Sequence, residues 1–156
     1  MSRSPASPNI VYVVSHDTGR FMGCYGRPVG RFTPNLDRFA GESVRFDRMY
    51  CAAACCGPSR VCALTGLHSQ RTGVLGLGHF GWLLPDAFRT TVDDLNDAGY
   101  ETAHFGFMHE RLYGGMRYKV DGRVGDERYW NCDTRVAVDN AVEFLSKRDR
   151  SKPFYI

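Results

Sequence analysis

The order of apolar and polar positions predicts strands and helices that alternate along the chain. Residues 9–14 form a short β-branched apolar run, which is typical of a strand buried on both faces of a parallel sheet. Apolar and polar side chains alternate over residues 43–50, which predicts a half-buried strand. Residues 101–105 and 152–156 are further apolar runs and predict two more strands.

Four segments between these runs carry the apolar spacing of amphipathic helices. They are residues 33–40, 58–64, 91–98 and 135–146, and in the last of them five side chains should face the core: Val136, Val138, Ala141, Val142 and Leu145. Strands that alternate with helices predict an α/β fold, in which helices flank a mixed, largely parallel sheet. Residues 106–133 are rich in glycine and arginine and predict a surface excursion, and residues 1–8 a flexible leader.

The amino-acid composition is that of a globular protein and excludes several other classes. The chain has 156 residues, of which 43% are hydrophobic and 24% charged, as in ordinary globular domains and unlike disordered or coiled-coil chains. The net charge of +3 is small and scattered, so we expect no nucleic-acid partner. No run approaches the roughly 20 apolar residues of a membrane span, and the first residues lack the apolar stretch of a secretory signal. A cytoplasmic protein is therefore the default expectation.

Four of the six cysteines crowd into residues 51–62, and three interpretations of this cluster compete. Without an export signal, structural disulfides are not expected. A zinc site is disfavoured because the paired spacings of such sites are missing. A cysteine-dependent phosphatase loop has five residues between the cysteine and its arginine. With Arg60 as the arginine, the cysteine would have to be residue 54, which is alanine, so this interpretation is disfavoured. The third interpretation places Cys56 at a helix N-terminus, where free N–H groups and the Arg60 guanidinium favour an anion.

Residues 56–66 read Cys-Gly-Pro-Ser-Arg-Val-Cys-Ala-Leu-Thr-Gly, which resembles the sulfatase signature Cys-x-Pro-Ser-Arg-x-x-x-Leu-Thr-Gly. Other segments resemble that family in order and spacing: residues 8–11 with Asp17, 23–26, 33–37, 99–103 and 106–109. The sulfamidase-like (heparan N-sulfatase) branch is the most similar. The resemblance implies an alkaline-phosphatase-like α/β fold, of which residues 9–156 are the N-terminal part of the catalytic domain, with an incomplete sheet.

The resemblance also implies the catalytic groups. Cys56 matches the cysteine that formylglycine-generating enzyme oxidises to formylglycine, an aldehyde. Arg60 matches the arginine that orients this group, and His109 matches an active-site histidine, a general acid–base. Phe107 stands where the family has a lysine that contacts sulfate.

A divalent metal, with calcium as the expected ion, is implied as well. Asp17 matches one carboxylate of an N-terminal metal-binding pair, and the formylglycine from Cys56 would be a further ligand. His16 stands where the family commonly has a second aspartate. Imidazole is a poor calcium ligand, so His16 would support the site indirectly or bind a softer metal.

The predicted function is hydrolysis of sulfate esters or N-sulfates in a sulfated small molecule or sulfated carbohydrate, with no membrane partner. The chain is expected to be a truncated sulfatase, and its activity in isolation is left open. Two alternatives stay open. One is a phosphoesterase of the same superfamily, and the other is a non-catalytic sulfatase-like remnant, which His16 and Phe107 favour.

Overall fold

The computed structural model describes residues 7–108, 110, 116–123 and 133–156. It divides into two compact units, Met1–Tyr12 with Cys51–Ile156 as unit 1, and Val13–Tyr50 as unit 2. Each unit is described by itself. Among the helices of the described residues, none has the length and apolar character needed to cross a membrane.

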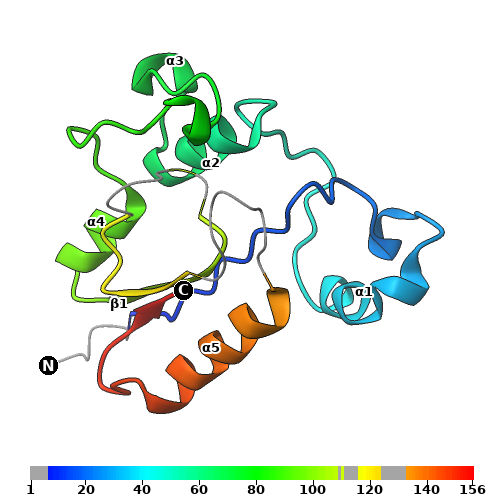
Figure 1. Ribbon diagram of the computed structural model, residues 1–156. Coiled ribbons are helices and arrows are strands. Elements are labelled where there is room, and N and C mark those ends of the chain that lie inside the picture. The colour runs from blue at the N-terminus through cyan, green and yellow to red at the C-terminus, as the bar shows by residue number, and fades with distance from the viewer. Residues whose placement is uncertain (1–6, 109, 111–115, 124–132) are drawn as a thin grey trace, which may run out of the picture. The chain divides into compact units, whose positions relative to one another are not determined.

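Unit 1 is built on a small parallel sheet in the order β2-β1-β3, which confirms the predicted α/β class. The strands are β1 (Glu101–Gly106), β2 (Val120–Arg123) and β3 (Phe154–Tyr155). Ile10 adds one bridging residue beside β3, where its N–H donates to the Phe154 carbonyl at 2.8 Å. Because parallel neighbours need a crossover, α5 (Thr134–Lys147) connects β2 to β3, and it packs on the sheet with the Phe144 ring 5.6 Å from that of Phe105 (Figure 1).

Three further helices belong to unit 1: α2 (Cys56–Thr65), α3 (Ser69–Thr72) and α4 (Thr91–Asp97), with a 3-10 turn, η3 (Gly78–Phe80). Glycine ends α2, because Gly66 adopts a left-handed φ of 68° and its N–H donates to the Cys62 carbonyl. Apolar side chains of α2 enter two different parts of the core. Val61 packs in a cluster with Val74 and Leu84, and Leu64 in a cluster with Met108 and Met116.

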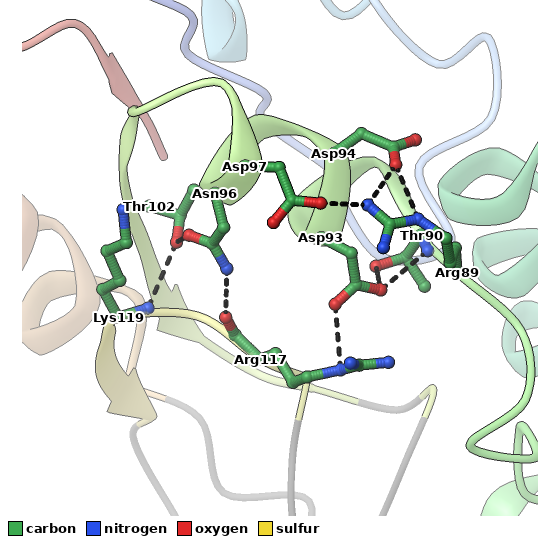
Figure 2. A network of polar contacts seen from close by, with 9 residues as sticks. All are labelled: Arg89, Thr90, Asp93, Asp94, Asn96, Asp97, Thr102, Arg117 and Lys119. Atoms are coloured by element: carbon green, nitrogen blue, oxygen red, sulfur yellow. Dashed lines mark hydrogen bonds and ion pairs between the residues drawn. The ribbon is translucent and has the colours of Figure 1, made fainter.

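A polar network joins α4 to the residues before β2 (Figure 2). The Thr90 N–H donates to Asp93 Oδ2 at 2.8 Å, and this hydrogen bond caps the N-terminus of α4. The other carboxylate oxygen, Asp93 Oδ1, lies 2.9 Å from Arg117 Nε. Asn96 donates to the Arg117 carbonyl at 2.7 Å and accepts from Thr102 Oγ1, also at 2.7 Å. One face of α4 therefore holds both β1 and residues 117–119 in place.

Unit 2 contains the 3-10 turns η1 (Gly23–Tyr25) and η2 (Gly30–Phe32) and the helix α1 (Pro34–Gly41). The Asp37 carboxylate joins them, because it accepts from the Cys24 N–H at 2.7 Å and from Thr33 Oγ1 at 3.2 Å. A Cβ at Gly23 would lie 2.2 Å from Asp37 Oδ2 and 2.6 Å from the Gly30 Cα, so only glycine fits there. Residues 23–26 and 33–37, two of the segments that carry the family resemblance, thus form one hydrogen-bonded structure.

Two strand predictions are wrong. Residues 9–14 give a single bridge at Ile10, and Val11 and Val13 are 58% and 83% exposed. Residues 43–50 form no strand, and Val44 and Phe46 are 81% and 64% exposed. An apolar run, or an alternation of apolar and polar residues, forms a strand only where another strand lies beside it to pair with. Among the described residues, β3 pairs with residues 9–14 only at Ile10, and no strand pairs with residues 43–50.

The sequence predicted the positions of the helices along the chain better than it predicted which of their side chains are buried. The helices predicted over residues 33–40, 91–98 and 135–146 are confirmed as α1, α4 and α5 within two residues at each end, and α2 begins two residues before the predicted start. The predicted core face of α5 is wrong, since Val136, Val138 and Val142 are 42% to 59% exposed and α5 meets β1 through Phe144. Strand β2 lies inside the predicted surface excursion and was missed.

The network around Asp93 gives a stability prediction. Asp93→Ala removes the α4 cap and leaves Arg117 without its carboxylate, so unfolding in urea should show a loss of about 2 kcal/mol or more. Asp97→Ala is the matched control on the same helix. Asp97 is 71% exposed in its ion pair with Arg89, so its loss should cost less than about 1 kcal/mol. Equal losses would contradict the role given to the network.

Candidate functional site

Cys56 is the first residue of α2, and local sequence explains why the helix begins there. Cys55 has an extended backbone and caps the helix, with its carbonyl accepting from the Ser59 N–H at 2.8 Å. Pro58 lies in the first turn, where a missing N–H costs no helical hydrogen bond, and its ring is fully buried. The Cys56 side chain therefore lies at the end of α2 where the helix dipole favours negative charge.

The Cys56 thiol is not an activated thiolate. Burial raises its pKa above the ordinary value of 9.0, against the smaller opposing effect of the Gly57 backbone N–H. Cysteine nucleophiles need the reverse, a lowered pKa. None of the described cysteines, which are Cys24, Cys51, Cys55, Cys56 and Cys62, forms a disulfide, and Cys132 lies outside the described residues.

Arg60 lies one turn after Cys56 on the same face of α2. Its Nη1 is 3.3 Å from Glu110 Oε1, and the two side chains are only 15% and 8% exposed. The Phe107 ring lies against the same guanidinium, with its centroid 6.0 Å from Cζ. Arg60 is thus a part-buried, paired cation and not a surface arginine.

Phe107 and Glu110 change the charge around Arg60. A lysine at position 107 would add a second cation beside Arg60, whereas the Phe107 ring attracts the guanidinium through its π face. Glu110 adds a carboxylate that sequence reasoning missed. The one signal in the sequence was an acidic residue directly after His109.

His109 lies outside the described residues, so its role stays a prediction. Its two neighbours are both placed. Met108 is 1% exposed and shares a cluster with Leu64 of α2, and Glu110 pairs with Arg60.

His16 and Asp17 belong to unit 2, and Cys56 belongs to unit 1. His16 Nδ1 lies 3.6 Å from Asp17 Oδ1, with side chains 41% and 87% exposed. Asp17 has a φ of 51°, in the left-handed region where aspartate is tolerated better than most residues.

The described donors do not form a calcium site. No group of three or more His, Cys, Asp or Glu side chains comes together as a metal site in the part of the chain that the structure describes. Calcium takes six to eight oxygen ligands, and His16 and Asp17 together offer one carboxylate and one imidazole. The metal role of His16, Asp17 and Cys56 therefore stays a prediction, and no chemical step is derived through a metal.

Comparison with known proteins agrees with the sequence resemblance. The profile of a family described as Sulfatase matches residues 8–156. An N-acetylglucosamine-6-O-sulfatase of Bacteroides thetaiotaomicron is 33% identical over 94% of this chain and 29% of that protein. Human steryl-sulfatase is 34% identical over 75% of this chain and 24% of its own length.

A solved structure shares the fold. It is described as BT4656 in complex with its substrate D-glucosamine-2-N,6-O-disulfate, and it matches with a TM-score of 0.77 and 29% identity. The match covers 95% of this chain and 33% of that one. The chain therefore spans about a third or less of the length of the proteins that it matches.

The raised pKa of Cys56 gives a reactivity prediction. At neutral pH, iodoacetamide should modify Cys56 more slowly than the exposed Cys51, because alkylation requires the thiolate and burial disfavours it. Peptide mass spectrometry over a time course measures both rates in one sample. A faster reaction at Cys56 would show an activated thiolate and contradict this description.

Proposed function

The chain belongs to the sulfatase family, and we propose that it carries the catalytic cysteine and arginine of a hydrolase of sulfate esters or N-sulfates. One observation supports this above the others. The signature cysteine, Cys56, begins a helix whose next turn presents a part-buried arginine, Arg60, on the same face. That arrangement suits an oxyanion held at a helix N-terminus.

Conversion of Cys56 to formylglycine by formylglycine-generating enzyme is part of the proposal. One hydroxyl of the hydrated aldehyde would attack sulfur as the bond from sulfur to the substrate alcohol or amine breaks. The second hydroxyl would lose its proton as the C–O bond to sulfate breaks, which releases sulfate and restores the aldehyde, so that a difficult displacement is divided into two easier steps. The raised pKa of the unmodified thiol supports a modified residue over direct thiolate attack.

Arg60 and the first turn of α2 would bind the sulfate group. Guanidinium N–H groups donate strong, charge-assisted hydrogen bonds to oxyanions, and the helix N-terminus adds its unpaired N–H groups. His109 would donate or accept the proton at the leaving group.

Sulfated carbohydrate is the substrate class that we propose. Two relatives, which match over 94% and 95% of this chain, are described as an N-acetylglucosamine-6-O-sulfatase and as a protein in complex with its substrate D-glucosamine-2-N,6-O-disulfate. Both names point to a sulfated amino sugar.

The test is expression together with formylglycine-generating enzyme, followed by assays with Ca²⁺ on glucosamine 6-sulfate and on the matching phosphate ester. We expect mass spectrometry to find an aldehyde in place of the Cys56 thiol, and sulfate to be released. Cys56→Ala should lower turnover by roughly a thousandfold or more, as removal of a nucleophile does in other hydrolases.

Cys51→Ala is the matched control, because Cys51 is exposed and precedes α2. It should keep full activity. An unmodified Cys56 together with faster phosphate than sulfate release would favour the phosphoesterase alternative, and loss of activity in Cys51→Ala would contradict the assignment to Cys56.

A further inference from the structure

We propose that Glu110 is the positioning residue for Arg60, and that its carboxylate holds the guanidinium where it meets the sulfate group of the substrate. The assignment rests on the function proposed above and extends it to a residue that the signature does not contain. It starts from the contact between Arg60 Nη1 and Glu110 Oε1 at 3.3 Å.

Burial makes this ion pair different from the surface pairs of the molecule. Arg60 and Glu110 are 15% and 8% exposed, whereas Arg89 is 57% exposed in its pairs with Asp94 and Asp97. A buried charge loses its hydration, so each partner depends on the other. The location of the Arg60 guanidinium is therefore tied to that of Glu110.

Glu110 is itself held close to α2. Cys56, Arg60 and Leu64 follow one another at intervals of four residues, which places them along one face of the helix. Leu64 shares an apolar cluster with Met108, which is 1% exposed and lies two residues before Glu110. An apolar contact thus holds Met108, and an ion pair holds Glu110, beside the helix face that begins with Cys56.

The pair leaves Arg60 with capacity for a ligand. A guanidinium has five N–H donors in a rigid plane, and the contact with Glu110 is through Nη1. The same group can hold Glu110 on one side and donate to a sulfate oxygen on another. Phe107 covers the guanidinium without using a donor, because its ring interacts through the π face.

Two roles for Glu110 predict opposite effects on anion binding. If Glu110 only adds negative charge near the site, its removal makes the site more positive and sulfate binds more tightly. If Glu110 positions Arg60, its removal lets the guanidinium move and sulfate binds more weakly. The sign of the change therefore separates the two roles.

The experiment measures binding of inorganic sulfate to the full chain by calorimetry, with chloride at matched ionic strength as the reference. We expect Arg60→Gln and Glu110→Ala each to weaken sulfate binding by at least about tenfold. In the Arg60→Gln background, Glu110→Ala should have no further effect. Glu110→Asp keeps the charge with a shorter reach and should restore part of the affinity.

Asp93→Ala is the matched control, because it also removes a buried carboxylate paired with an arginine. Asp93 lies on α4, which meets α2 through Thr91 and Leu64, at the end of α2 opposite Cys56. The substitution should lower stability and leave sulfate affinity unchanged. Should Glu110→Ala fail to fold, Glu110→Gln keeps an acceptor oxygen without the charge and should weaken binding in the same direction.

Sulfate binding that needs Arg60 and is equal or tighter without Glu110 would overturn the assignment and leave the proposed function standing. A wild-type chain that neither binds nor releases sulfate would overturn both. Weaker binding in Asp93→Ala would also overturn the assignment, because the effect would then follow stability alone.

Discussion

The anchoring of α2 on two separate parts of the core is the constraint on which the candidate site depends. A helix of ten residues has little stability by itself, so its place comes from Val61, which is fully buried with Val74 and Leu84, and from Leu64, which packs with Met108. These contacts fix both the axis and the rotation of the helix. Cys56 and Arg60 share one face because they lie four residues apart, and the rotation of the helix decides which way that face points.

The electrostatics of the site follow from the same packing. Met108 shares a cluster with Leu64 of α2, and its near neighbours Phe107 and Glu110 bring an aromatic ring and a carboxylate to Arg60. Phe107 and Glu110 belong together in this description. Phe107 stands where sulfatases commonly have a lysine, so that cation is missing. Glu110 balances the charge of the cation that is present, Arg60.

Local sequence was enough for features that depend on local physics. The helices α1, α4 and α5 were predicted from their caps and apolar spacing. The place of Cys56 at the start of a helix, with Arg60 one turn on, was predicted from the residues around Pro58 and is observed in α2, whereas the catalytic roles of Cys56 and Arg60 stay predictions from the family resemblance. Prediction failed where the outcome depends on residues far along the chain. Residues 9–14 have the composition of a buried strand, but only β3 lies beside them, and only at Ile10 do they form a bridge.

Glu110 illustrates the same limit at the site. Nothing in its immediate sequence distinguishes it from a surface glutamate, because its partner lies 50 residues earlier in the chain. The exposed face of α5 is a further case. Its valines have the spacing of a core helix, but the contact with the sheet is made by Phe144.

A crystal structure of the chain soaked with sulfate tests the central claim most directly. The account predicts a sulfate ion at the start of α2, with an oxygen accepting from the Arg60 guanidinium while Glu110 remains paired with the same side chain. A sulfate bound elsewhere, or an Arg60 turned away from Cys56 in its presence, would contradict it.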